Sequence, residues 1–280
     1  MGVGTTATYR SATYLLVGIG VHAVLCVSLY GAPLRLATTS PDSTQLLADL
    51  DLGPQIVATV QPEVLAEPYR SLPSLGSLYL PNIEKLLSAN VDTVVVDKSL
   101  HQVLFQSAIE RLRIPYVNLH ITSLESLLHD AERIARTLGG KLPESLRTCA
   151  TSLQTRRELP RYTFLLLAWT NPAMAFGKKT LLSDILHAFG GENLVPNKWN
   201  QSYPQLSVEW LLHHRPDYVF VVTYTESDIE RAQADIAKWW PQSDTKLIAL
   251  PANHFSHANF SPLKHLRQLK LPQIPKGECP

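Results

Sequence analysis

Two segments of this chain, one in each half, repeat the same arrangement of residues. In the first, residues 82–87 form a helix start that carries a glutamate, and the apolar run 91–97 follows. In the second, residues 203–209 lead into a short helix with a glutamate in its first turn, and the apolar run 215–222 follows. Short apolar runs bounded by polar turns are typical of buried strands. The repetition predicts two similar lobes, each with helices that feed buried strands.

The rest of the chain supports an α/β fold. Strands alternate with helices in both halves, which favours mostly parallel sheets covered by helices on both faces. Two amphipathic helices without an intervening strand separate the halves. The expected strands begin at Leu34 and cover residues 56–60, 94–96, 115–119, 162–168, 218–223 and 246–250, and the expected helices include 123–138, 143–158, 180–189 and 227–240.

These patterns divide the chain into five segments. The N-terminal stretch 1–32 has a weakly basic start and an apolar core, which is the layout of a secretory signal. Its alternative is a membrane anchor that is never cleaved. Lipidation at Cys26 is not expected, because Leu25 is too bulky for the residue before a lipidated cysteine. The predicted segments are a signal peptide 1–32, an N-terminal lobe 33–122, a connecting helical segment 123–159, a C-terminal lobe 160–270 and a Pro-rich tail 271–280.

Charge and cysteine content limit the partners. The chain has 25 Lys and Arg against 24 Asp and Glu, and removal of Arg10 with the signal leaves 24 of each. A chain without basic excess has little attraction for phosphate backbones, so nucleic-acid binding is not expected. Cys149 and Cys279 remain outside the signal. They can pair in an oxidising compartment, but the loose tail around Cys279 favours two free thiols, and both possibilities stay open.

Sequence motifs of catalysis are missing. The chain contains no Gly-x-Ser-x-Gly, phosphate-binding loop or His-Glu-x-x-His motif. His254 and His257 follow the last expected strand, where loops of a parallel sheet line a ligand crevice. A spacing of three places both imidazoles on one side of a helical turn, which suits a metal, but no group of carboxylates accompanies them. No metal site and no cofactor are therefore predicted.

The order and spacing of Gly190-Gly191-Glu192-Asn193-Leu194, residues 203–209 and residues 215–222 resemble a known family. They are similar to the periplasmic solute-binding proteins that deliver cobalamin, ferric siderophores and haem to ABC importers. The resemblance implies two Rossmann-like lobes with mostly parallel sheets, joined by a single long α-helix that residues 143–158 match. It also implies a monomeric binding protein of the periplasm, not an enzyme, whose partners are a corrinoid, ferric siderophore or haem ligand and an ABC permease in the inner membrane.

The resemblance also implies roles for particular residues. Glutamates that match Glu84 and Glu209 project from the two lobes toward arginines of the permease. Large flat side chains suit a macrocycle or siderophore because they bury much area at low entropic cost. In the cobalamin-binding members several first-lobe positions are aromatic, but Leu78 and Lys98 stand here. The expected ligand-binding residues are Phe176, Trp199, Tyr203, Tyr224, His254 and Phe255 in the second lobe and Leu78 and Lys98 in the first.

Two other functions remain as alternatives. One is a metal-dependent enzyme on the same two-lobed scaffold, with His254 and His257 as ligands. The other is a membrane-tethered sensor in which the N-terminal apolar segment stays as an anchor.

Overall fold

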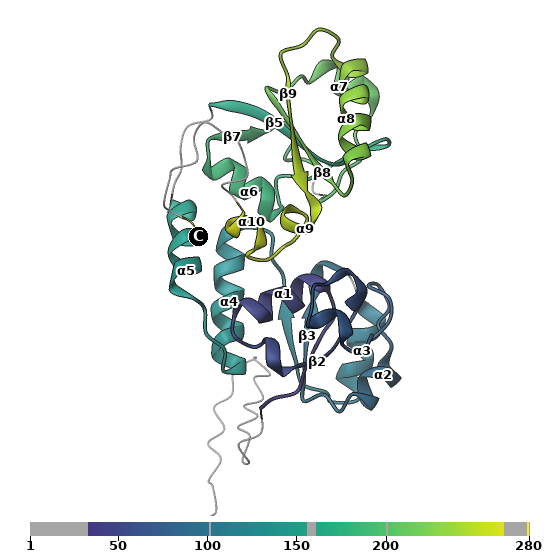
Figure 1. The fold of residues 1–280 in the computed structure, drawn as a ribbon, viewed down its shortest axis with the longest axis vertical. Coiled ribbons are helices and arrows are strands. Elements are labelled where there is room, and N and C mark those ends of the chain that lie inside the picture. The colour runs from purple at the N-terminus through teal and green to yellow at the C-terminus, as the bar shows by residue number, and fades with distance from the viewer. Residues whose placement is uncertain (1–32, 101, 156–160, 200, 266–278, 280) are drawn as a thin grey trace, which may run out of the picture.

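The computed structural model describes residues 33–100, 102–155, 161–199, 201–265 and 279. The predicted signal, residues 1–32, lies outside the described residues, and so does the predicted tail, residues 271–280, except for Cys279. The molecule consists of two α/β lobes, one above the other in Figure 1, with a pair of helices along one side. The predicted α/β fold with two lobes and mostly parallel sheets is confirmed.

The first lobe is built on a sheet of four parallel strands in the order β2-β1-β3-β4. Alternate strand residues face opposite layers of helices. Val95 packs on the side of α1, whereas Val94 and Val96 pack on the side of α2 and α3, against Phe105 and Leu86. The elements are β1 (Leu36–Thr38), α1 (Pro41–Asp49), β2 (Ile56–Thr59), α2 (Ile83–Ser88), β3 (Thr93–Asp97), α3 (Val103–Arg111) and β4 (Tyr116–Leu119).

The second lobe is built on a sheet with the order β6-β5-β8-β9, in which β7 also pairs with β5. The strands β5, β7, β8 and β9 are parallel, and only β6 is antiparallel. The sequence reading did not include the three-residue strands β6 and β7. The elements are β5 (Tyr162–Thr170), β6 (Ala173–Ala175), α6 (Leu181–Ala188), β7 (Gly191–Asn193), α7 (Val208–His213), β8 (Tyr218–Thr223), α8 (Glu226–Trp239) and β9 (Lys246–Pro251).

Two adjacent glycines end α6 and start β7. Gly190 has a φ of +76°, a conformation that side chains disfavour, so it terminates the helix. A Cβ on Gly191 would lie 2.8 Å from the Phe164 ring, so only glycine fits where β7 approaches β5. The pair therefore ends the helix and also sets the close packing of β7 on the sheet.

The connection between the lobes consists of α4 (Leu124–Leu138) and α5 (Glu144–Thr155), which pack against each other. At the start of α4, the Leu124 N–H donates to the Asp184 carboxylate of α6 at 2.8 Å. Just after its end, the Lys141 N–H donates to the carbonyl of Leu50 at 2.8 Å. The helix α4 therefore spans both lobes and α5 returns beside it, a helical pair where the resemblance indicated one long helix.

The end of the chain returns to the junction of the lobes. After β9 come the short helices α9 (Ala252–Phe255) and α10 (Ser261–Lys264). The helix α10 packs on α5, and its Lys264 pairs with Asp49 of α1. Cys279 forms a disulfide with Cys149, which is fully buried in α5. The preference for two free thiols was wrong, because the returning chain places Cys279 beside the core. Among the described residues, no helix combines the length and apolar character needed to cross a membrane.

Candidate functional site

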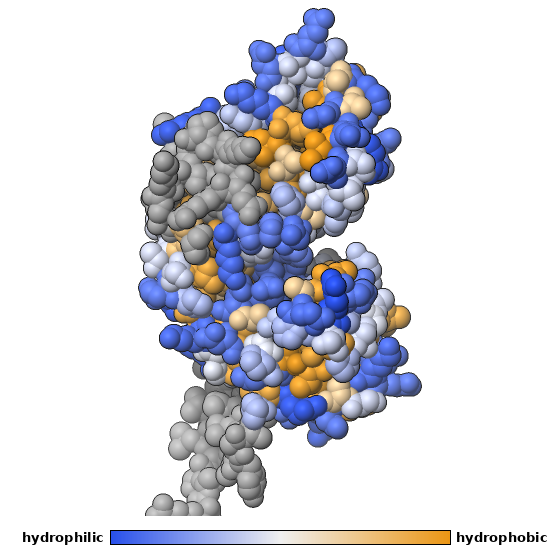
Figure 2. Space-filling view, in the orientation of Figure 1, coloured by the Kyte–Doolittle hydropathy of each residue, from blue (hydrophilic) through white to orange (hydrophobic). Residues whose placement is uncertain are grey.

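The molecular surface is hollowed between the two lobes, on the side opposite α4 and α5 (Figures 1 and 2). The loops after the parallel strands of both sheets meet there. The chain after β1 enters α1, whose Asp42 contacts Ala258 in the segment after β9. The carboxyl ends of parallel strands form the usual ligand crevice of α/β proteins. The interlobe cleft is thus the candidate ligand site.

On the first-lobe side, Asp97 ends β3 and is almost completely buried. Its backbone N–H donates to the Thr39 hydroxyl at 2.9 Å, and one carboxylate oxygen accepts from the Ser99 hydroxyl at 2.6 Å. Burial raises the pKa of the Asp97 carboxyl, the hydrogen bonds from Ser99 oppose this, and the nearby charge of Asp42 adds to the increase. The first lobe therefore brings two carboxylates, Asp42 and Asp97, to the cleft, and sequence reasoning had assigned neither of them to the site.

On the second-lobe side, Tyr203 is held by a loop that pairs with β6. The Ala175 N–H donates to the carbonyl of Pro204 at 2.9 Å, and Gly177 N–H donates to Ser202 at 2.8 Å. Phe176, which is buried, packs its ring edge-to-face with Tyr203 at 5.1 Å between centroids. The short strand β6 therefore fixes the loop, and Phe176 supports the Tyr203 ring from below rather than lining an open surface.

The Tyr203 ring is exposed, yet its hydroxyl lies among groups of both lobes. The residue is 53% exposed. Desolvation raises the pKa of Tyr203 to about 12, and the charges of Asp42 and Asp97 and the phenols of Tyr224 and Tyr79 act in the same direction. Tyr203 thus stands near Tyr224 of its own lobe and near Tyr79 of the opposite lobe. Sequence reasoning had selected Tyr203 and Tyr224. Of its two first-lobe choices, Leu78 and Lys98, the first is the immediate neighbour of Tyr79.

A groove adjoins this aromatic group. It has a volume of about 580 Å³ and lies between the end of β5, the end of β8 and α8. The exposed rings of Trp169 and Tyr224 line it, together with the ion pairs Arg231–Asp228 and Lys238–Asp235. Tyr224 therefore belongs both to the groove and to the surroundings of Tyr203.

The other predicted ligand residues have different surroundings. Trp199 packs its ring on Trp210 of α7 at 5.5 Å. Phe255 is 1% exposed and contributes to the core. Leu78 is half-buried, and its carbonyl accepts a hydrogen bond from the Gln102 side chain. Lys98 is exposed directly after β3. The structure places Tyr203 near Tyr224, whereas Phe255 lies in the core and Trp199 packs against Trp210.

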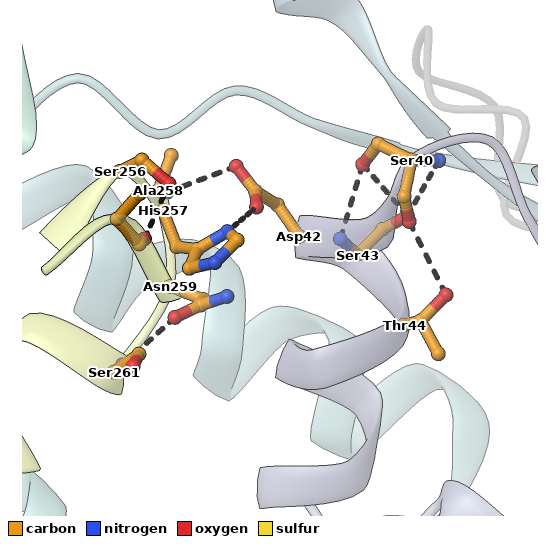
Figure 3. Close-up of polar contacts among 10 residues, drawn as sticks. Ser40, Asp42, Ser43, Thr44, Ser256, His257, Ala258, Asn259 and Ser261 are labelled. Atoms are coloured by element: carbon orange, nitrogen blue, oxygen red, sulfur yellow. Dashed lines mark hydrogen bonds and ion pairs between the residues drawn. The ribbon is translucent and has the colours of Figure 1, made fainter. Parts of the chain in front are cut away.

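The two histidines after β9 do not face a common point. The His254 ring stacks on His265 at 3.6 Å, whereas His257 points to Asp42 (Figure 3). Burial lowers the pKa of His254, and the neighbouring His265 and His257 lower it further. Within the described part of the chain, no three His, Cys, Asp or Glu side chains gather in a way that could hold a metal ion.

The contact between His257 and Asp42 joins the lobes directly. The Asp42 carboxylate lies 2.6 Å from His257 Nδ1 through one oxygen and accepts the Ala258 N–H at 2.9 Å through the other (Figure 3). Burial lowers the pKa of the His257 imidazole, but the hydrogen bond and charge of Asp42 outweigh it, so the net direction is upward.

Known proteins share this sequence pattern and this fold. The sequence matches the model of a family described as "Periplasmic binding protein" over residues 36–238. A vitamin B12-binding protein of Photorhabdus laumondii subsp. laumondii is 26% identical over 242 residues, which cover 82% of this chain and 84% of that protein.

Among solved structures, the periplasmic vitamin B12 binding protein BtuF of Vibrio cholerae has a TM-score of 0.65 at 17% identity, covering 84% of this chain and 94% of that chain. The periplasmic haem-binding protein HutB of Vibrio cholerae has a TM-score of 0.65 at 19% identity, covering 84% and 97%. At these identities the likeness to the solved structures concerns the fold.

Proposed function

The chain belongs to the periplasmic binding protein family, and we propose that it captures a corrinoid, haem or ferric siderophore between its lobes and delivers it to an ABC permease in the inner membrane. The protein is a substrate-binding protein of the cobalamin, haem and siderophore type, not an enzyme. Its relatives include proteins named for vitamin B12 and for haem. These ligands are large, contain a metal and carry extended conjugated or polar surfaces.

The convergence of three tyrosines on the cleft is the observation that supports this proposal most. Tyr203 and Tyr224 come from the second lobe and Tyr79 from the first, and all three are among the exposed large side chains. A phenol ring offers a flat apolar face and a polar tip at low entropic cost. Three such rings around one cleft suit a ligand with a broad face and polar edges.

A binding screen tests this function. Cyanocobalamin, haemin and ferrichrome are titrated separately into the protein, and the fluorescence of its five tryptophans is recorded. We expect one of the three to quench the fluorescence with a stoichiometry of about one and a dissociation constant near or below a micromolar, an affinity of roughly 8 kcal/mol or more. Absence of binding by all three, checked by calorimetry, contradicts the proposal.

Docking on the permease is assigned to Glu84 and Glu209. Each is the second residue of a six-residue helix, α2 or α7, and each helix has a side-chain N-cap, Asn82 or Ser207. Both glutamates are exposed and precede a buried parallel strand. Their matching places in two lobes support a role as paired anchors for arginines of two permease subunits, where charge-assisted bonds would fix the orientation.

Apolar side chains accompany both glutamates at the surface. Leu80 and Leu87 are exposed around α2, and Val208 and Leu212 are exposed on α7. Such residues beside a charged anchor are typical of a protein–protein contact with an apolar centre. They therefore support docking of these two helices on another protein.

Export to the periplasm is the last part of the proposal. Residues 1–32, which lie outside the described residues, are proposed to act as a signal that is removed. Intact-mass measurement of the secreted protein is expected to give a chain shorter by about thirty residues. A secreted species that keeps these residues and partitions with membranes favours the membrane-tethered sensor instead.

A further inference from the structure

One carboxylate of the first lobe holds two groups of the second lobe's C-terminal segment. Asp42 lies in the first turn of α1, and His257 and Ala258 follow β9 and α9. One oxygen of Asp42 contacts His257 Nδ1 at 2.6 Å, and the other accepts the Ala258 N–H at 2.9 Å. These partners are separated by 215 and 216 positions in the chain. The contact therefore depends on how the two lobes are placed relative to each other.

A second ion pair joins the same two elements. Asp49, also on α1, lies 2.5 Å from the Lys264 ammonium of α10. Residues seven apart fall on the same face of a helix, so one face of α1 carries both connections. The side chain of Asp49 is almost completely buried, whereas those of Asp42 and His257 keep 22% and 29% exposure. The pair at the cleft is thus the one that solvent protons reach.

We propose that Asp42 and His257 are positioning residues whose bridge sets the separation of the lobes at the ligand cleft and tightens when His257 is protonated. Asp42 is suited to this role because its charge also acts on Tyr203, an exposed aromatic residue of the second lobe at the cleft. A change in the bridge therefore shifts the first-lobe wall relative to the second-lobe aromatic group. The inference rests on the proposed function only in taking this cleft as the ligand site.

The groups around His257 decide the direction of the pH effect. Asp42 of α1 faces it within hydrogen-bonding distance, and Asp97, at the end of β3, lies near Asp42. Burial lowers the pKa of His254 of α9, His257 in turn lowers it further, and the ring of His265 of α10 stacks on His254.

Burial alone would lower the pKa of His257, but Asp42 raises it above the ordinary value of 6.5. A histidine whose pKa is raised by folding contributes its full stabilisation at pH values below its pKa in the unfolded chain. That stabilisation is lost as the pH rises through its pKa in the folded protein. The bridge is therefore tightest in acid.

The test measures the distance between the lobes without any ligand. Spin labels carried by non-natural amino acids replace Leu104 on α3 and Leu212 on α7, both of which are exposed. Pulsed electron resonance then gives the distance distribution at about pH 5 and about pH 8.5, on either side of the histidine range. A hydrogen bond to a charged group changes an equilibrium by about tenfold or more, so we expect the wider separations to become about tenfold more populated at the higher pH.

Two variants and two controls make the result specific. His257→Gln and Asp42→Asn are expected to abolish the pH dependence, since in each variant one of the two charged groups of the bridge is missing. His213→Ala, at an exposed histidine at the end of α7, is expected to keep it. Lys264→Met is expected to widen the distribution at both pH values, because the second ion pair is lost at each. Circular dichroism and thermal unfolding confirm that each variant is folded.

The outcomes separate this proposal from the proposed function. A pH-independent distribution in the parent protein, or an unchanged pH dependence in His257→Gln and Asp42→Asn, overturns the bridge. Neither result bears on whether the protein binds cyanocobalamin, haemin or ferrichrome. Conversely, a protein that binds none of these three but shows the expected pH dependence retains the bridge and loses the proposed ligands.

Discussion

The ring and the hydroxyl of Tyr203 have different surroundings. The ring is open to solvent and supported at its edge by Phe176, whereas the hydroxyl lies near the carboxylates of the first lobe. Because its pKa is raised to about 12, the hydroxyl stays protonated at every pH at which ligand binding is measured. Tyr203 is thus a neutral stacking surface and hydrogen-bond donor, and it contributes no pH dependence of its own.

Replacing Tyr203 tests its contact with ligand. Tyr203→Ala removes the stacking face and is expected to weaken binding of the ligand found in the screen roughly five- to hundredfold, or about 1–3 kcal/mol. Tyr203→Phe keeps the face and is expected to stay within about threefold of the parent. Isothermal titration calorimetry measures both. Equal affinity of the parent and Tyr203→Ala removes this residue from the ligand site.

Asp97 is expected to reduce stability at neutral pH. Its pKa in the folded protein is raised, chiefly by burial. Its contribution to stability is therefore most favourable at pH values below its pKa in the unfolded chain, and it declines as the pH rises through its pKa in the folded protein. Asp97→Asn is therefore expected to raise the Tm at pH 7 by about 2–4 °C, and the gain is expected to vanish near pH 4. Differential scanning calorimetry at the two pH values measures it.

Asp228 provides a comparison of opposite sign. Hydrogen bonds from the backbone N–H groups of Thr225 and Tyr224 lower its pKa, so its stabilising contribution is present above the unfolded value and is lost as the pH falls through the folded one. Asp228→Asn is expected to lower the Tm at pH 7.

The result for Asp97 can also come out the other way. A lower Tm for Asp97→Asn at pH 7 would show that the hydrogen bonds of Asp97 with Ser99 outweigh the cost of burying its carboxylate.

At the scale of elements, the disulfide fastens the end of the chain to α5. It joins Cys149 and Cys279 across 130 positions, so it restricts a long loop of the unfolded chain. Replacing both cysteines by serine is expected to lower the free energy of unfolding by about 2–5 kcal/mol. Urea denaturation of the oxidised protein, the reduced protein and the double variant measures this. The same midpoint for the oxidised and reduced forms contradicts a stabilising role.

The long elements could be predicted because their sequences carry the signal locally. The strands β3, β5 and β8 are apolar on successive residues since helices cover both faces of each sheet. The strands β6 and β7 have only three residues each and owe their structure to pairing with β5. No local sequence pattern indicates these two strands, so β6, the strand that holds the Tyr203 loop, was not predicted from the sequence.

The site was predicted only in part for a similar reason. Tyr203 and Tyr224 were proposed as ligand-binding residues because they follow predicted elements, and Phe255 was included by the same argument. The turn of α9, however, rotates Phe255 into the core. The pairing of Asp42 with His257 depends on the return of the chain from the second lobe, and nothing in either local sequence specifies a partner more than two hundred residues away.

For the whole molecule, a shared core limits how far the lobes can move. The largest cluster of buried apolar residues runs without a break from Leu36 of the first sheet through Ile134 of α4 to Phe164 and Phe220 of the second. Together with the bridges from α1, this packing favours small adjustments of the cleft over a wide hinge motion. Small adjustments of the cleft would leave the spacing between Glu84 and Glu209 nearly unchanged, which is what the proposed docking on a permease requires.

Glu84 and Glu209 are the proposed anchors, and their replacement separates docking from ligand capture. The double variant Glu84→Ala and Glu209→Ala is expected to reduce ligand uptake into cells or proteoliposomes at least tenfold, because two charge-assisted contacts are lost. The ligand affinity of the purified protein is expected to stay within about twofold, because both side chains point to solvent.

Glu125 is the matched control, since it is also an exposed acid in the first turn of a capped helix, α4. If these glutamates served only the helix dipole, Glu125→Ala and the double variant would lose a similar small amount of stability and neither would lose uptake. Loss of ligand affinity in step with uptake would instead place the two glutamates at the ligand site.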